Sequence, residues 1–248
     1  MLKAAYLNET EKLLARKKYI VLLIVDVAFC LLSALTRFLS TLIGDGVLNT
    51  PIAFGDLLTD GISVYFLFFL PLIALLGCAD LFGAEAHERT LRMLIQRPVA
   101  RWKLFLAKAA AVCTVCAGFA LIHFVILLLL RLIFDHSLSG AGFALSAYLL
   151  DLLPLAVVVL FFALLNQTGA GSSSTVALSV VVYLVVVFIG RYVAPFSGLV
   201  FTEYLSWHNI WLGTTLPLPA LLPKIGILLG SALVFAGGGL ILFERKEI

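Results

Sequence analysis

The chain has 248 residues, of which 62% are hydrophobic and only 12% are charged, and its mean hydropathy is +1.14. A soluble domain is about 45–50% apolar and about 25% charged, so this chain cannot cover a globular surface with polar groups. The composition also excludes a disordered chain, a collagen-like fibre and a disulfide scaffold. We therefore predict an integral membrane protein.

Six apolar runs are long enough to cross a bilayer, which takes about 20 helical residues. They are Tyr19–Ile43, Ile62–Phe82, Leu104–Phe134, Phe143–Leu165, Ser172–Val193 and Leu222–Phe243. A membrane β-strand would alternate apolar and polar residues, and runs such as Val125–Leu130 do not. The predicted fold is all-α, with six transmembrane helices in a single domain that spans residues 1–248.

The orientation of the spans follows from their flanking Lys and Arg residues, which concentrate on the cytoplasmic side. Of the 17 basic residues, 13 lie before the first span, between or just inside the second and third spans, or after the last span. The opposite loops carry acidic residues instead, namely Asp45, Asp56, Asp60, Asp135 and Glu203. We therefore predict a multi-pass protein whose two termini are both cytoplasmic.

The outer segment 194–221 is the longest of these opposite loops and contains three prolines and several aromatic residues. The aromatics are Phe196, Phe201, Tyr204, Trp207 and Trp211. Since Trp and Tyr favour the headgroup level of a bilayer, we expect short interfacial or re-entrant helices at the extracellular end. An aromatic belt is the favoured interpretation, and a gating lid is the alternative.

No catalytic or nucleotide-binding motif is present. The sequence lacks a G-x-x-x-x-G-K-[ST] loop, so the chain itself is not expected to bind ATP or to be an enzyme. All four cysteines (Cys30, Cys78, Cys113 and Cys116) lie in predicted spans, which indicates small buried side chains rather than disulfides.

Three carboxylates lie within predicted spans, where an Asp near a helix centre costs about 2.5–3.5 kcal/mol. Asp26 either lines a polar pathway for a cationic or amphipathic substrate or pairs with a neighbouring helix, with Arg37 or Lys224 as candidate partners. Asp151 is the better pathway candidate. For Asp80, pairing between helices is the favoured interpretation.

The histidines carry no motif that indicates a ligand site. His123 is surrounded by apolar residues in the third span, and we interpret it as a packing residue. No second ligand stands at metal-binding spacing, so we assign no metal site. His208 lies in the outer segment, which we predict to be aqueous.

The cytoplasmic segment 84–101 interrupts the apolar pattern. Leu91, Leu94 and Ile95 form one apolar helical face, Glu88 and Arg92 form a favourable i,i+4 pair, and Pro98 should end the helix. An interfacial anchor on anionic lipid would explain the basic and apolar residues. It would not explain the glutamates at the start of the helix, which favour docking to a cytoplasmic partner.

This segment resembles the signature of type-2 ATP-binding cassette (ABC) permeases. The resemblance rests on Glu85-x-x-Glu88-x-Thr90-Leu91-Arg92-x-Leu94, followed by Arg97-Pro98-Val99-x-Arg101. In that family the segment forms a cytoplasmic coupling helix between the second and third spans. Residues Asn8–Lys18 likewise resemble the amphipathic elbow helix of the family, within residues 1–18. The sequence departs from the family pattern at Arg89, where glycine is common, and at Ala100, where serine is common.

The resemblance implies a function as the permease subunit of an ABC exporter. Two cytoplasmic ATPase subunits would bind ATP and Mg, a second permease chain would complete a homo- or heterodimer, and this chain would need no cofactor. The implied ATPase-coupling residues are Glu85, Glu88, Thr90, Leu91, Arg92, Leu94, Pro98 and Arg101. The implied location is the plasma membrane (bacterial inner membrane), in contact with membrane lipid and not with nucleic acid.

The cargo class follows from related permeases, which include antibiotic-peptide (lantibiotic) export and immunity proteins. We expect an amphipathic peptide, lipid or drug. Two other functions stay open: a membrane assembly or sensor protein that docks a partner without transport, and an ion-coupled secondary transporter. The latter would need inverted repeats and interrupted midplane helices, and we find no convincing internal repeat.

Overall fold

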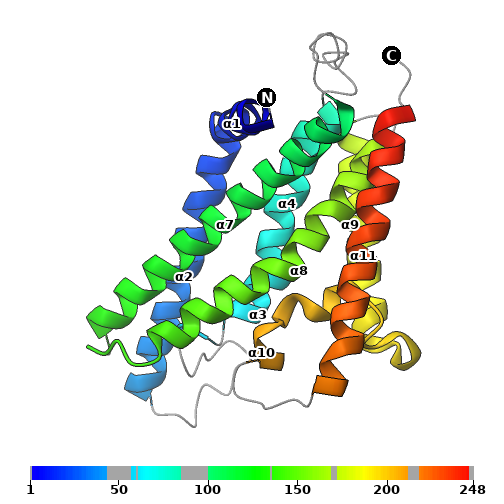
Figure 1. Cartoon of the computed structure of the whole chain (residues 1–248). Helices are drawn as coiled ribbons and strands as arrows, with labels where there is room; N and C mark the ends of the chain where they lie inside the picture. The colour runs from blue at the N-terminus through cyan, green and yellow to red at the C-terminus, as the bar shows by residue number, and fades with distance from the viewer. Residues whose placement is uncertain are drawn as a thin grey trace.

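The computed structural model describes residues 2–43, 57–59, 61–84, 100–134, 136–168, 172–211 and 218–245. Within these ranges the regular structure is entirely helical, and six helical stretches are long and apolar enough to cross a membrane. The predicted all-α fold with six spans is therefore confirmed. Figure 1 shows them as one bundle, in which α7 and α8 slant across the other spans.

The spans begin and end within a few residues of their predicted limits. They are α2 (Lys17–Ile43), a second span from α3 (Ile62–Val64) to η2 (Ala79–Ala84), α7 (Arg101–Phe134), α8 (Ala141–Thr168), α9 (Ser172–Tyr192) and α11 (Leu218–Arg245). The agreement has a simple cause: the apolar runs set the spans, and the charged residues at their ends stay outside the hydrocarbon. The loop acids Asp45, Asp56, Asp60 and Asp135 lie outside the described residues.

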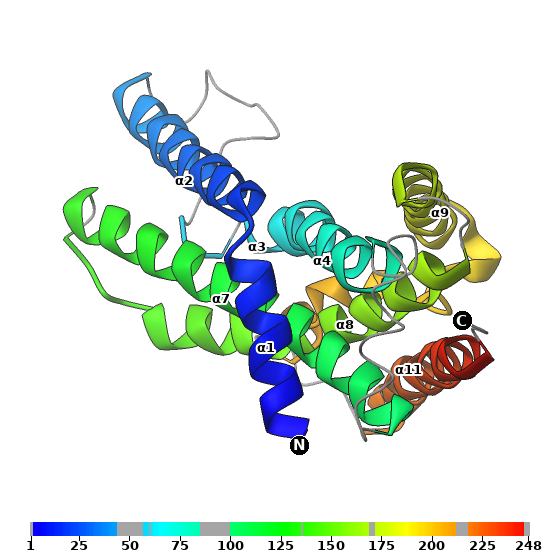
Figure 2. The ribbon, with the colours of Figure 1, turned by 90° about the horizontal axis from the view of Figure 1, so that it is seen from above.

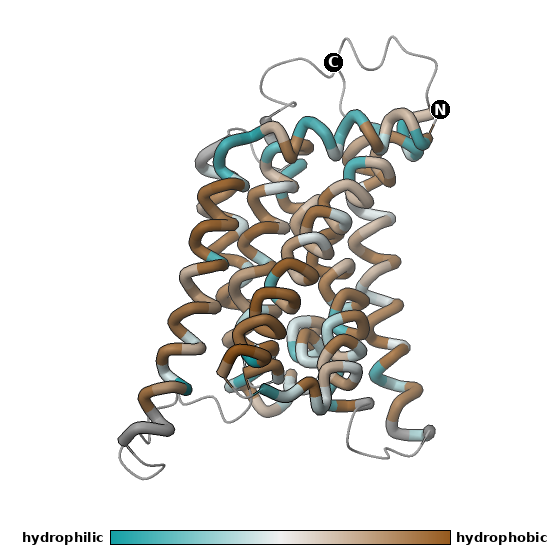
Figure 3. The backbone as a smooth tube through the Cα atoms, turned by 90° about the vertical axis from the view of Figure 1, so that its left-hand side faces the viewer, coloured by the Kyte–Doolittle hydropathy of each residue, from teal (hydrophilic) through white to brown (hydrophobic). Residues whose placement is uncertain are grey.

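The N-terminal helix α1 (Leu2–Leu14) crosses one end of the bundle over α7, as Figure 2 shows. The chain turns at Ala15 and Arg16 before α2 begins, and the main-chain N–H of Arg16 donates to the carbonyl of Leu13 at 3.1 Å. The end of α11 lies at the same end of the bundle as α1 (Figure 1). This end is also rich in hydrophilic residues, whereas the spans are mostly apolar (Figure 3).

The second span is not a regular α-helix, and its irregularity has a local cause. It runs through α3, the π-helix η1 (Tyr65–Phe69), α4 (Leu70–Cys78) and η2. Pro71 has no N–H, so the carbonyl of Leu67 loses its α-helical donor four residues later. The hydroxyl of Tyr183 on α9 donates to that carbonyl at 2.6 Å, which satisfies a polar group that water could not reach within a bilayer.

The centre of the bundle is formed by the second span, α7 and α8. Helix α8 contacts α4, α7, α9 and α11, and about two thirds of the second span is buried. By contrast, α2, α9 and α11 pack on one side only and expose long apolar faces. These faces are suited to lipid or to another membrane chain.

Glycines allow two close helix contacts. A Cβ atom at Gly239 on α11 would lie 2.9 Å from the ring of Phe105 on α7, and one at Gly77 would lie 3.1 Å from the side chain of Val112. Close packing at this end of the sixth span therefore depends on Gly239, whereas a Cβ at Gly237 would meet nothing within 4 Å.

The outer segment folds back into the bundle through η3 (Ala194–Phe196), η4 (Phe201–Ser206) and α10 (His208–Trp211). Phe201, Tyr204 and Trp207 are buried, and η4 packs against α8. The favoured aromatic-belt interpretation is therefore wrong for these three residues. The short helices of the outer segment were expected. The aromatic rings of Phe201, Tyr204 and Trp207 are buried in the core because they pack against the apolar surface of α8.

Candidate functional site

The predicted coupling segment falls largely outside the described residues. Glu85, Glu88, Thr90, Leu91, Arg92, Leu94 and Pro98 are in this group. Arg101 is described as the first residue of α7, and its Nη1 donates to the main-chain carbonyl of Glu244 at 2.6 Å. Arg101 therefore joins the start of the third span to the end of the sixth, and its contact with an ATPase stays a prediction.

A buried lysine connects the elements on either side of that segment. Lys108 on α7 is 0% exposed, and its Nζ lies 3.3 Å from Glu9 Oε2 on α1 and 3.0 Å from the carbonyl of Leu81 on η2. Glu9 Oε1 also accepts a hydrogen bond from Lys12. A buried charge of this kind is tolerated only when it is paired, so Lys108 fixes α1, η2 and α7 to one another.

A second ionic cluster fixes the turn between α1 and α2 to the same end of the second span. Asp80 on η2 accepts hydrogen bonds from Arg16 Nη1 at 2.8 Å and from the hydroxyl of Tyr19 at 3.2 Å, and it also pairs with Lys18. Asp80 is thus a pairing residue between helices, as the favoured interpretation held. A displacement of η2 would therefore also move the start of α2 and the turn after α1, because Asp80 contacts residues in both.

Deep in the bundle, Asp26 pairs with a histidine rather than with Arg37 or Lys224. Asp26 Oδ1 lies 2.7 Å from His123 Nδ1, and both residues are fully buried. Cys30, one turn after Asp26, places its Sγ 3.2 Å from the same nitrogen. The ring of His123 also stacks on Tyr65 with 3.7 Å between centroids. Asp26 therefore belongs to a polar cluster between the first, second and third spans.

Asp151 forms the other buried acid–imidazole pair. Its Oδ1 accepts the main-chain N–H of His208 at 2.7 Å, and its Oδ2 lies 2.6 Å from His208 Nδ1. His208 is buried, so the expectation of an aqueous position for this residue is wrong. The reason is that the outer segment inserts α10 against α8, and the carboxylate then receives two donors that compensate its burial.

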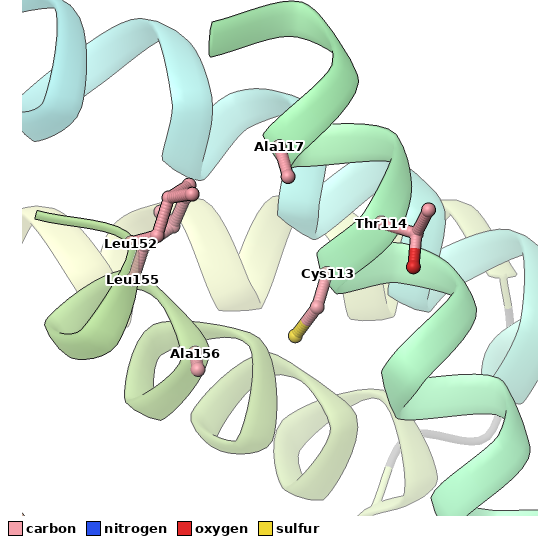
Figure 4. Close-up of a pocket in the computed structure, with 6 residues that line it drawn as sticks. All are labelled: Cys113, Thr114, Ala117, Leu152, Leu155 and Ala156. Atoms are coloured by element: carbon pink, nitrogen blue, oxygen red, sulfur yellow. The ribbon is translucent and has the colours of Figure 1, made fainter. Parts of the chain in front are cut away.

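Two apolar cavities adjoin α8, and Ala156 lines both of them. One of about 290 Å³ lies between α7 and α8, where Figure 4 shows the side chain of Cys113 on α7 pointing toward the part of α8 that carries Ala156, while Thr114 lies on another side of α7. The other, of about 400 Å³, lies between α8 and α11, and Trp207 is one of its lining residues. Leu153 and Leu229 line this second cavity and are each more than half exposed, so it opens sideways from the bundle.

The comparison with protein families decides the class of this helical bundle. A family model described as "ABC-2 family transporter protein" matches residues 8–190, which include the second half of α1, the first four spans, nearly all of the fifth span and the predicted coupling segment. The chain belongs to the ABC-2 transporter family. Among curated proteins, no match was found.

Membership of the family supports a permease subunit of an ABC transporter, a non-catalytic membrane component that associates with ABC ATPase subunits. The ABC-2 permease is thus a multi-pass membrane protein, as its six apolar helices also indicate. The match agrees with the resemblance found in the coupling segment.

Sequence reasoning missed the partners of the ABC-2 permease's buried carboxylates. Asp26 and Cys30 are spaced i,i+4 and so lie on one helical face, a signal that was available in the sequence. Nothing in the sequence pairs them with His123, which is about a hundred residues away. The pairing of Asp151 with His208 was equally hidden, because it depends on how the outer segment folds back.

Proposed function

We propose that this chain is the permease subunit of an ATP-driven exporter that moves an amphipathic substrate, such as a peptide, lipid or drug, out of the cell or the membrane. Two separate cytoplasmic ATPase subunits drive it, and a second permease chain completes the pathway in the plasma membrane. The family match over residues 8–190 is the observation that carries the proposal.

The ionic clusters support a coupling role for segment 84–101. This segment lies between η2 and α7, and both elements are held to α1 by Lys108, through the carbonyl of Leu81 and through Glu9. An ATPase that binds two states of the segment with different affinity shifts the equilibrium between them. Because the ionic clusters join α1, the start of α2, η2 and α7, a change in the conformation of the segment would move the first, second and third spans.

The cavity between α8 and α11 supports an amphipathic cargo. Its wall is almost wholly apolar, and it opens sideways, so an apolar chain can enter it from the bilayer. Leu150 and Trp207, two of its lining residues, directly precede Asp151 and His208 in the sequence, so a polar pair is present near the cavity without lining it. This combination suits a molecule with an apolar body and a polar or cationic group.

Co-purification tests the proposal. The tagged permease, expressed with its native neighbouring genes and extracted in mild detergent, should retain a soluble ABC ATPase in about equal amount, since each of two permease chains would bind one ATPase subunit. Reconstituted complex should hydrolyse ATP faster in the presence of substrate. Transport that follows an ion gradient and persists without ATP would instead establish a secondary transporter, and retention of a partner that does not hydrolyse ATP would establish a sensor or assembly protein.

A further inference from the structure

The buried group formed by Asp26, Cys30 and His123 has the composition of a metal site. One ligand atom from each residue lies within 4.8 Å of the other two, and each residue is at most 1% exposed. Carboxylate, thiolate and imidazole are the three side-chain ligands that Zn²⁺ takes in proteins. Because Asp26 and Cys30 are spaced i,i+4 on α2, they offer a ready pair of ligands to the imidazole on α7.

Hydrogen bonding alone leaves this group incompletely satisfied. His123 Nδ1 faces both Asp26 Oδ1 at 2.7 Å and Cys30 Sγ at 3.2 Å, but a single N–H can point at only one of them. Among the described residues, no hydrogen-bond partner is found for Asp26 Oδ2 or for His123 Nε2, although both atoms are buried. Buried polar atoms of this kind normally have a partner, and a bound cation would supply one for the carboxylate.

The distances fit a cation after small adjustments. A tetrahedral Zn²⁺ at about 2.0–2.3 Å from each ligand separates two ligand atoms by about 3.3–3.6 Å. The observed distance from Sγ to Nδ1 is 3.2 Å, and the distance from Oδ1 to Nδ1 is 2.7 Å. The second of these would have to widen by about 0.6 Å, which a small rotation of the Asp26 carboxylate provides. The stacking of His123 on Tyr65 keeps the imidazole in place.

The charges also balance. On binding, Cys30 loses its thiol proton, Asp26 and His123 release the proton that they share at Nδ1, and His123 keeps a proton on Nε2. A divalent cation, two anionic ligands and a neutral imidazole then give a site with no net charge, which is the form that a bilayer interior tolerates best.

We propose that Asp26, Cys30 and His123 bind a divalent thiophilic cation of the Zn²⁺ class and thereby clamp the first span to the third. The clamp matters because α2 is weakly packed: only 28% of its most apolar stretch is buried inside the bundle, and α7 is its principal neighbour. Cation occupancy would therefore set how firmly α2 is held in the bundle.

Cobalt substitution tests the site with a spectroscopic probe. The full chain, purified in detergent and treated with a chelator, is titrated with Co²⁺, and its absorption is recorded. We expect about one ion per chain, a near-ultraviolet charge-transfer band from thiolate to cobalt, and a higher melting temperature. In Cys30→Ser the band should disappear and the affinity should fall about tenfold or more. Competition with Zn²⁺ should bleach the band in the wild type.

Cys116→Ser is the matched control, because Cys116 is also a buried cysteine in the bundle but lies outside the cluster. It should keep the band and the affinity. Cys30→Ala provides a second variant with little change in packing, and its melting temperature without metal shows whether it is folded. A wild-type chain that gives no thiolate band, or a band that survives in Cys30→Ser, would overturn the proposal and leave Asp26 and His123 as a hydrogen-bonded pair.

Discussion

At the scale of single residues, the buried charged groups Lys108, Asp26, Asp80 and Asp151 are each paired with a residue that is distant in the sequence. Lys108 is the extreme case, because its ammonium group is completely buried and interacts with Glu9 and the carbonyl of Leu81. Breaking such a pair from one side leaves an uncompensated charge in a medium of low dielectric constant. Single substitutions here should have larger effects than their modest changes in size suggest.

Lys108→Met should lower the free energy of unfolding by about 3–5 kcal/mol, because it leaves the Glu9 carboxylate buried without its buried partner. Unfolding by SDS in mixed micelles measures this change. Lys103→Met, which alters a partly exposed lysine on the same helix, should cost less than about 1 kcal/mol. Equal effects of the two substitutions would show that burial of Lys108 does not matter.

Asp151→Asn tests the pathway role of the second buried carboxylate. Asparagine keeps an acceptor for the His208 main-chain N–H but removes the negative charge. If the charge attracts a cationic group of the substrate, the substrate concentration for half-maximal stimulation of ATP turnover should rise about tenfold, equivalent to about 1.4 kcal/mol. Unstimulated turnover should stay unchanged. Unaltered substrate dependence would assign Asp151 a purely structural role.

At the scale of elements, the second span departs most from regularity, and its neighbours compensate for the departure. The π-helix η1 and Pro71 disturb the backbone hydrogen bonds near Leu67, and Tyr183 on α9 supplies the missing donor. This hydrogen bond attaches span two to span five. Without it, the carbonyl of Leu67 would be left without a hydrogen-bond donor inside the bilayer, which is energetically unfavourable.

Tyr183→Phe should destabilise the permease by about 1–2 kcal/mol, because the carbonyl of Leu67 loses a buried hydrogen bond while the ring is kept. The loss should appear as a lower melting temperature in detergent. Tyr192→Phe removes a hydroxyl from a tyrosine that is 72% exposed on the same helix, and it should leave the melting temperature unchanged. If the hydrogen bond made no net contribution to stability, Tyr183→Phe and Tyr192→Phe would have the same melting temperature.

The contact of α11 with α7 allows a test in which two neighbouring glycines should behave differently. Gly239→Ala places a Cβ against Phe105, which is itself fully buried, and overpacking should cost about 1–3 kcal/mol. Gly237→Ala meets nothing within 4 Å and should be neutral or slightly stabilising, because alanine is the better helix former. Thermal unfolding of the two variants in the same detergent compares them directly, and the same sign for both would contradict the described packing.

At the scale of the whole molecule, the fold could be predicted from the sequence, because the bilayer requires long apolar runs and the chain supplies six of them. The N-terminal helix was also foreseen, although it ends at Leu14 rather than near Lys18. The aromatic residues of the outer segment were misjudged. Trp207 and Tyr204 suit either a membrane interface or a protein core, and composition does not distinguish between these two environments.

The candidate sites were only half predictable. Asp26 and Asp151 stand out in apolar runs and were identified from the sequence alone. Their partners His123 and His208 were not, because tertiary contacts between residues that are far apart leave no trace in local spacing. For the coupling residues the situation is the opposite. A sequence motif predicts all of them, but Arg101 is the only one among the described residues.

The central claim is that segment 84–101 couples this ABC-2 permease to an ATPase, and ATP turnover by the purified complex tests it most directly. Glu88→Lys reverses a predicted docking charge, whereas Glu11→Lys makes the same reversal at an exposed position of α1. We expect Glu88→Lys to reduce both ATPase retention and substrate-stimulated turnover by about tenfold or more, whereas Glu11→Lys should retain both. Wild-type retention and turnover in Glu88→Lys would contradict the claim.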